Sequence, residues 1–130
     1  MNHEGAYDVD WRLELLPIPV TDVDRAKAFY VEQAGFTLDH DHVVSDDVRF
    51  VQLTPPGSAC SIAFGKGVSD APPGTARAQV VVPDIRVAHA ELVARGVDAG
   101  EVQTFPWGEF VFFEDPDGNR WSVQAIAQQS

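Results

Sequence analysis

Apolar and polar residues along the chain fall into patterns that predict eight strands and two helices. Short runs rich in apolar residues predict strands at residues 12–20, 37–44, 48–54, 60–64, 77–82, 97–102, 109–114 and 120–126. Thr21 or Asp22 can cap a helix that ends before Gly35, and Asp84 can cap a second helix that ends before Gly96. The predicted order is therefore strand, helix and three strands, repeated once.

The two halves of this order are also related in sequence. Residues 20–28, V-T-D-V-D-R-A-K-A, match residues 82–90, V-P-D-I-R-V-A-H-A, 62 positions later. Gly35 then matches Gly96, and the turn T-P-P-G at 54–57 matches D-P-D-G at 115–118, both 61 positions later. We therefore expect an N-terminal tail (1–9), one domain (10–126) and a C-terminal tail (127–130). The domain divides into module one (10–66), a Gly- and Pro-containing linker (67–74) and module two (75–126).

Composition and charge narrow the possible partners. The chain has 130 residues, with 9 Lys plus Arg against 20 Asp plus Glu, and a net charge of −11. Acidic proteins lack the cations that bind nucleic-acid phosphates, and no apolar run reaches the roughly 20 residues that span a bilayer. We therefore expect neither a nucleic-acid partner nor a membrane. Cys60 is the only cysteine, which favours a reducing, cytoplasmic setting.

Two motifs of this chain resemble a known family. The motifs are V-x-D-x-x-R-A-x-x-F-Y followed by G-F at the first helix, and F-x-D-P-D-G-N-x-W at residues 113–121. Together with the doubled strand–helix pattern, they resemble the glyoxalase / bleomycin-resistance / extradiol-dioxygenase superfamily, also called vicinal oxygen chelate (VOC). The resemblance implies an α+β fold of two βαβββ modules related by a pseudo-two-fold axis. These form a cupped, eight-stranded mixed sheet, and the resemblance further implies a homodimer.

The resemblance also implies four metal positions. In members that use a metal, the ligands come from four strands, at positions that correspond here to Leu15, Ser61, Arg77 and Ser122. Divalent metals in proteins bind imidazole, carboxylate or thiolate groups, and Arg is a permanent cation. We therefore predict no metal at this site and no cofactor, which weighs against the metal-dependent activities of the family.

The same positions outline a predicted small-molecule pocket. Alternation along a strand puts Arg77 with Gln79, and Ser122 with Gln124. The resemblance turns Phe112 inward, and the loop at 105–108 allows Trp107 to cover the cavity. With Leu15 and Ser61 of module one, these eight residues are the predicted ligand-binding set. We expect an aromatic ligand, with or without an acidic group, or a cationic one; Arg77 needs an anion, from the ligand or from Glu109 or Glu114.

Two functions remain open at this point. One is a bleomycin-resistance-like protein that binds a small molecule in a metal-free cupped cavity. The other is an enzyme of the same superfamily, of lyase, isomerase or dioxygenase type, that acts without the usual metal site or with a displaced one. His40 and His42 share a strand face and could hold such a metal, although a solvated strand edge is the simpler interpretation. Glu14 would enter the cup only if the strand register slipped by one residue.

Overall fold

The computed structural model describes residues 9–126. The predicted tails lie outside the described residues, apart from Val9. In the first half the elements are β1 (Leu15–Pro17), α1 (Val23–Ala28), the π-helix η2 (Phe29–Gln33), β2 (Thr37–Ser45), β3 (Val48–Thr54) and β4 (Ser61–Phe64). In the second half they are β5 (Arg77–Val81), α2 (Ile85–Ala94), β6 (Gln103–Phe105), β7 (Gly108–Glu114) and β8 (Arg120–Ile126).

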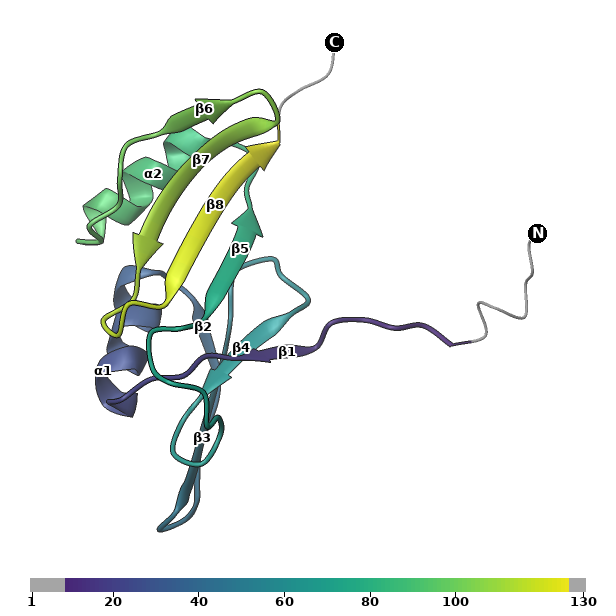
Figure 1. Cartoon of the computed structure of the whole chain (residues 1–130), viewed down its shortest axis with the longest axis vertical. Coiled ribbons are helices and arrows are strands. Elements are labelled where there is room, and N and C mark those ends of the chain that lie inside the picture. Colours follow the sequence, from purple (N-terminus) through teal and green to yellow (C-terminus); the bar gives the residue numbers. More distant parts are fainter. Residues whose placement is uncertain (1–8, 127–130) are drawn as a thin grey trace.

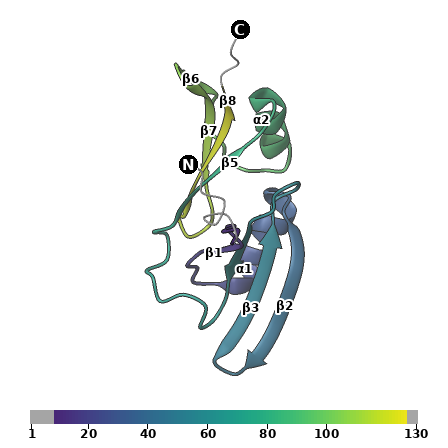
Figure 2. The same ribbon diagram turned by 90° about the vertical axis from the view of Figure 1, so that its right-hand side faces the viewer.

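The predicted fold of two βαβββ modules is confirmed, and its strands divide between two sheets (Figure 1). The first sheet has the order β1-β4-β3-β2 and the second the order β5-β8-β7-β6. In each sheet the first strand of the module pairs in parallel with the last, and the other pairs are antiparallel. Helix α2 covers one face of the second sheet and leaves the other face open (Figure 2). Within residues 9–126, no helix is long and apolar enough to cross a membrane.

A π-helical turn explains why the sequence offset changes from 62 to 61. Asp22, one of the two predicted candidates, caps the first helix by accepting from one backbone N–H of the first turn, and Asp84 caps the second as predicted by accepting from two. The first helix needs one residue more than the second to reach its terminal glycine. The extra residue is accommodated where the Ala34 N–H donates to the Phe29 carbonyl, five residues back, at 2.9 Å. This wider turn places both Phe29 and Tyr30 in the core.

A buried polar network joins the modules. The Tyr30 hydroxyl donates to Asp115 Oδ2 at 2.7 Å and accepts from the Trp121 indole N–H at 2.9 Å. The Asn119 amide donates to the same carboxylate oxygen and to the Pro19 carbonyl, both at 2.8 Å. The D-P-D-G-N motif therefore connects the β7–β8 turn to the first helix and to the segment after β1.

Two predicted strands differ from the observed ones. The strand predicted at 12–20 is reduced to β1, because Pro17 and Pro19 have no N–H to donate to a ladder. The strand predicted at 97–102 is absent, and β6 forms at Gln103–Phe105 instead. The Val97 N–H already bonds the Leu92 carbonyl of α2, and the Ala99 N–H bonds the Val97 carbonyl. These bonds turn the chain at residues 97–99, so in the described structure the segment before β6 bonds β7 only through the Gly100 N–H, which donates to the Phe112 carbonyl at 3.1 Å.

Candidate functional site

The open face of the second sheet carries most of the predicted ligand-binding residues. Trp121 and Val123 of β8 are buried under the helices, so Ser122 and Gln124 point to the open face. The pairing of Gln79 with Ser122, and of Phe112 with the same Ser122, extends this face onto β5 and β7. The alternation expected from the sequence thus brings Arg77, Gln79, Phe112, Ser122 and Gln124 onto one surface.

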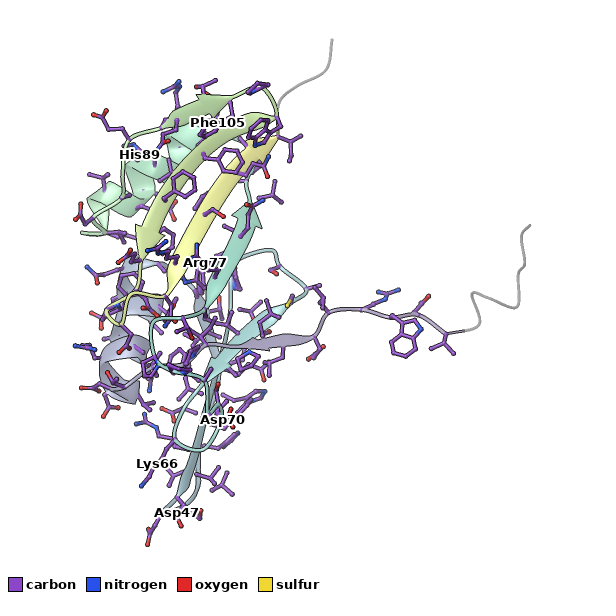
Figure 3. The ribbon with its side chains drawn as sticks, in the orientation of Figure 1. Asp47, Lys66, Asp70, Arg77, His89 and Phe105 are labelled. Atoms are coloured by element: carbon purple, nitrogen blue, oxygen red, sulfur yellow. The ribbon has the colours of Figure 1, made fainter. Side chains whose placement is uncertain are left out.

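Four aromatic rings form a continuous row across this face. Phe112 and Phe110 stack with their centroids 5.8 Å apart, Phe110 meets Phe105 edge-on at 5.6 Å, and Phe105 stacks on Trp107 at 5.4 Å. Phe110 is buried, whereas Phe112 and Trp107 are 42% and 62% exposed. The sequence predicts Phe105 in a loop, and only the β6–β7 hairpin, with its turn at Pro106 and Trp107, adds it to the row. Figure 3 shows Phe105 at β6, at the end of the sheet opposite to Arg77.

Amide groups run beside the aromatic row. The Gln79 amide donates to Gln124 Oε1 at 2.8 Å and its oxygen accepts from the Ser122 hydroxyl at 2.9 Å. Gln124 in turn donates to the Trp107 carbonyl at 3.3 Å. These bonds fix the amide orientations and link the β6–β7 turn to the sheet, so that polar groups are held in place next to an apolar surface.

Arg77 lies at the end of this face and is exposed, not enclosed as the cup prediction required. It lines a shallow cavity of about 760 Å³ together with Phe112, Ser122 and Arg120. Neither predicted internal partner takes it: Glu109 pairs with Arg86 at 3.2 Å and Glu114 with Arg120 at 3.8 Å. Among residues 9–126, no salt bridge to Arg77 is formed, and its guanidinium is available to an anion.

Leu15 and Ser61 lie on the other sheet, away from the residues just described. They are direct neighbours on β1 and β4, in the expected register, and Glu14 precedes β1 at an exposed position. The buried Ser61 hydroxyl shares a hydrogen bond of 2.6 Å with Thr54, which also contacts Asp39. A bulge at Asp39 turns its side chain toward this face.

The four positions that the family resemblance marks as metal ligands do not fit a divalent ion here. An aliphatic side chain, two hydroxyls and a guanidinium offer no imidazole, carboxylate or thiolate. The register also differs between modules: Leu15 lies beside Ser61, but Gln79 lies beside Ser122, and Arg77 lies two residues away, beside Arg120. The side chain next to Ser122 is therefore the Gln79 amide. With Gln79 in place of Arg77, the four positions still offer no imidazole, carboxylate or thiolate.

Other titratable groups of the first sheet are arranged as ion pairs or exposed rings. His40 and His42 stack at 5.5 Å, and no group of three His, Cys, Asp or Glu forms in the described part of the chain. Asp41 accepts from Lys27 at 2.8 Å and from two nitrogens of Arg49 at 2.9 and 3.0 Å. These bonds hold the pKa of Asp41 well below its usual range. Cys60 is half-buried rather than buried.

Comparison with known proteins agrees with this architecture. The crystal structure of TnmS3, an antibiotic binding protein from Streptomyces sp. CB03234, superposes with a TM-score of 0.81. It is 32% identical over 91% of this chain and 98% of that chain. A glyoxalase/bleomycin resistance protein from the same organism superposes with a TM-score of 0.75 and is 33% identical over 87% of this chain and 99% of that one.

Sequence comparison points to the same family. The chain is 28% identical to the uncharacterized protein YetH of Bacillus subtilis (strain 168) over 103 residues, which cover 77% of this chain and 86% of that protein. Residues 12–123 match the family model of the Glyoxalase/Bleomycin resistance protein/Dioxygenase superfamily. Together with the two βαβββ modules and the D-P-D-G-N turn, this match shows that the chain belongs to the glyoxalase/bleomycin resistance protein/dioxygenase superfamily.

Proposed function

We propose that this protein binds a small planar aromatic molecule on the open face of its second sheet, without a metal ion. The observation that carries the proposal is the row of Phe112, Phe110, Phe105 and Trp107, which leaves large aromatic surfaces exposed at its two ends. Exposed aromatic surface beside oriented polar groups is typical of ligand sites. The antibiotic binding protein TnmS3, with which the chain shares its fold, supports a binding role.

The polar groups of the face favour a ligand with one acidic group. The Arg77 guanidinium lies at one end of the cavity and lacks a carboxylate partner among the described residues. A charge-assisted hydrogen bond to a ligand carboxylate or phenolate is worth roughly 1.5–3 kcal/mol when it is shielded from water. The protein charge of −11 slows the approach of anions, so a zwitterion or a neutral aromatic with one acidic group fits best.

A calorimetric titration with matched probes tests the proposal. We expect 2-naphthoate to bind more tightly than naphthalene-2-carboxamide, and cyclohexanecarboxylate not to bind. Phe112→Ala should weaken 2-naphthoate about tenfold, because it removes roughly 1–2 kcal/mol of ring contact on the Arg77 side of the row. Trp107→Ala, at the opposite end of the row, should weaken it less. Val44→Ala, at an exposed position of β2, is the control for the aromatic variants. Arg77→Ala should weaken the acid but not the amide, with Lys66→Ala, an exposed cation outside the second sheet, as its control. Equal binding by all variants would refute the site.

We also propose that the protein is a homodimer. Val9, Trp11 and Leu13 alternate along the extended segment before β1 and are 62%, 92% and 73% exposed (Figure 1). Apolar groups this exposed gain stability when a second chain covers them. Sedimentation at micromolar concentration should give a dimer, and Trp11→Ser combined with Leu13→Ser should shift it toward monomer. A monomeric parent protein at that concentration would contradict the proposal.

A further inference from the structure

The two modules meet at two junctions that the internal repeat makes equivalent. At the first junction, the segment from Pro19 to the first helix meets the β7–β8 turn. At the second, the segment from Val81 to α2 meets the β3–β4 turn (Figure 2). The two helices are aligned residue by residue from their caps, Asp22 and Asp84. The two turns are aligned from their positive-φ glycines, Gly57 and Gly118.

The first junction is filled and joined by hydrogen bonds. Thr21 donates to Asp117 Oδ1 through its N–H at 3.2 Å and its hydroxyl at 2.6 Å, and Arg25 reaches the same oxygen at 3.3 Å. The Asn119 amide bonds the Pro19 carbonyl, as described above. The rings of Tyr30 and Trp121 occupy the remaining space, 5.8 Å apart.

The second junction has a different residue at each of these positions. Counted from the caps and turn glycines, the six replacements are Pro83 for Thr21, Val87 for Arg25, Leu92 for Tyr30, Pro56 for Asp117, Ser58 for Asn119 and Cys60 for Trp121. Pro83 has neither an N–H nor a hydroxyl, and Val87 and Leu92 have no polar group. Across the described residues, no hydrogen bond joins the turn at 54–58 to α2 or to the segment before it.

Smaller residues at the second junction leave a cavity, which we call the α2 cavity. Its volume is about 610 Å³, and its walls are mostly apolar, with Val81, Val87, Leu92, Pro55, Pro56 and Phe113 among them. This volume lies in the range of small-molecule pockets. The ionisable residues that line it are Asp84 and Glu91, both acidic, and Glu91 also pairs with Arg95, which lies outside the lining, at 3.7 Å. One oxygen of Asp84 caps α2 by accepting from two backbone N–H groups, and its other oxygen makes no bond among the described residues.

We propose that the α2 cavity is a second binding site, for a small aromatic amine. The aromatic ring of the ligand takes the space that Tyr30 and Trp121 fill at the first junction. Its ammonium group lies toward Asp84 and Glu91, where charge-assisted hydrogen bonds form. The site shares Gln79 with the open face. It is nevertheless distinct from the aromatic row, because most of its walls belong to α2, to the β3–β4 turn and to the helix-facing side of the second sheet. It would bind a cation, whereas the open face would bind an acid.

Tryptamine and indole-3-acetate are suitable probes, because they carry the same ring with opposite charge. In two-dimensional ¹H–¹⁵N NMR titrations of the full chain, we expect saturable binding of tryptamine, with the largest shifts at residues 57–58 and 84–92. Indole-3-acetate should leave those residues unshifted. Glu91→Gln should weaken tryptamine roughly threefold to tenfold, while Glu32→Gln, on the first helix and outside the cavity, should have no effect.

A cavity-filling variant tests whether tryptamine binds in the α2 cavity. Val87→Phe should weaken tryptamine at least tenfold, and Val93→Phe, the same type of change at an exposed position of α2 outside the cavity, should not. If Val87→Phe does not fold, Ser58→Phe fills the cavity from the exposed turn.

Three results would overturn the proposal. These are a failure of tryptamine binding to saturate, shifts that fall on residues 105–112 and 122–124, and binding of tryptamine by both filling variants as tightly as by the parent. If Val87→Phe alters the oligomeric state and not amine binding, the cavity is a contact between copies of the chain, and the proposal is wrong.

Discussion

The Tyr30 hydroxyl is the centre of the network that joins the modules, and its removal gives a sharp test of the fold. Tyr30→Phe keeps the buried ring and deletes one oxygen atom. That oxygen donates to Asp115 at 2.7 Å and accepts from the Trp121 indole N–H at 2.9 Å. The substitution therefore removes a hydrogen bond to a buried carboxylate and leaves a buried indole N–H without a partner.

The expected cost follows from these two losses. A hydrogen bond to a charged group contributes roughly 1.5–3 kcal/mol, and an unpaired buried donor costs roughly 1–3 kcal/mol. We expect Tyr30→Phe to lower the free energy of unfolding by about 3–5 kcal/mol, a large part of the 5–15 kcal/mol typical of a domain. For a chain of this length the midpoint of thermal unfolding should fall by roughly 10–20 °C.

Thermal and urea unfolding followed by circular dichroism measure this cost. Thr104→Val removes an exposed hydroxyl and should change the free energy of unfolding by less than about 0.5 kcal/mol. In a Trp121→Phe background the indole is gone, so Tyr30→Phe should cost at least about 1 kcal/mol less than in the parent. A loss below about 1 kcal/mol, or no coupling between the two positions, would show that the network does not hold the modules together.

Three further predictions concern pH and backbone. Burial and the Asp115 carboxylate raise the pKa of Tyr30, so its contribution is complete below pH 10 and is lost as the pH rises further. Above pH 10 the free energy of unfolding of the parent should fall more steeply than that of Tyr30→Phe, by about 1.4 kcal/mol per pH unit in urea titrations; parallel curves would contradict this. Hydrogen bonds from Arg49 and Lys27 lower the pKa of Asp41, so its contribution is present above about pH 4 and is lost on acidification. The parent should lose more stability than Asp41→Asn between pH 4 and pH 2, and an equal loss would exclude Asp41 as a source. A Cβ at Gly65 would lie 1.8 Å from the Arg49 carbonyl oxygen, whereas one at Gly57 would meet nothing within 4 Å. Gly65→Ala should therefore cost more than about 3 kcal/mol and Gly57→Ala about 1–2 kcal/mol, and similar melting curves for the two variants would refute the clash.

Local signals in the sequence predicted most of the elements. The caps Asp22 and Asp84 and the turn glycines act within a few residues, so their effect does not depend on the rest of the chain. The strands at 48–54 and 120–126 have the predicted bounds because apolar residues continue to the turns that end them. By contrast, the strand predicted at 97–102 fails because hydrogen bonds to the end of α2 compete with strand pairing.

Pairing between distant strands decided the composition of the candidate site. The sequence repeat equates Leu15 with Arg77, but the second sheet is paired two residues further along than the first, so Gln79 takes the place beside Ser122. A shift of two residues keeps each side chain on the same face of the sheet. The prediction of one shared surface is therefore unaffected by the shift; it covers Arg77, Gln79, Ser122 and Gln124. The row of four aromatic rings could not be predicted, because Phe105 joins it only through the β6–β7 hairpin.

The sequence by itself determined the two-module fold, its helix caps, its turns and the alternation of side chains on each strand. These features depend on interactions between residues close in the chain, and the internal repeat means that both modules carry the same local signals. Tertiary structure alone decided the register between strands, the aromatic row and the contrast between a filled and a hollow junction. The register and the junctions depend on how residues about 40 to 100 positions apart fill the same space, where side-chain volumes settle the outcome. The aromatic row depends on the β6–β7 hairpin, which brings Phe105 beside Phe110.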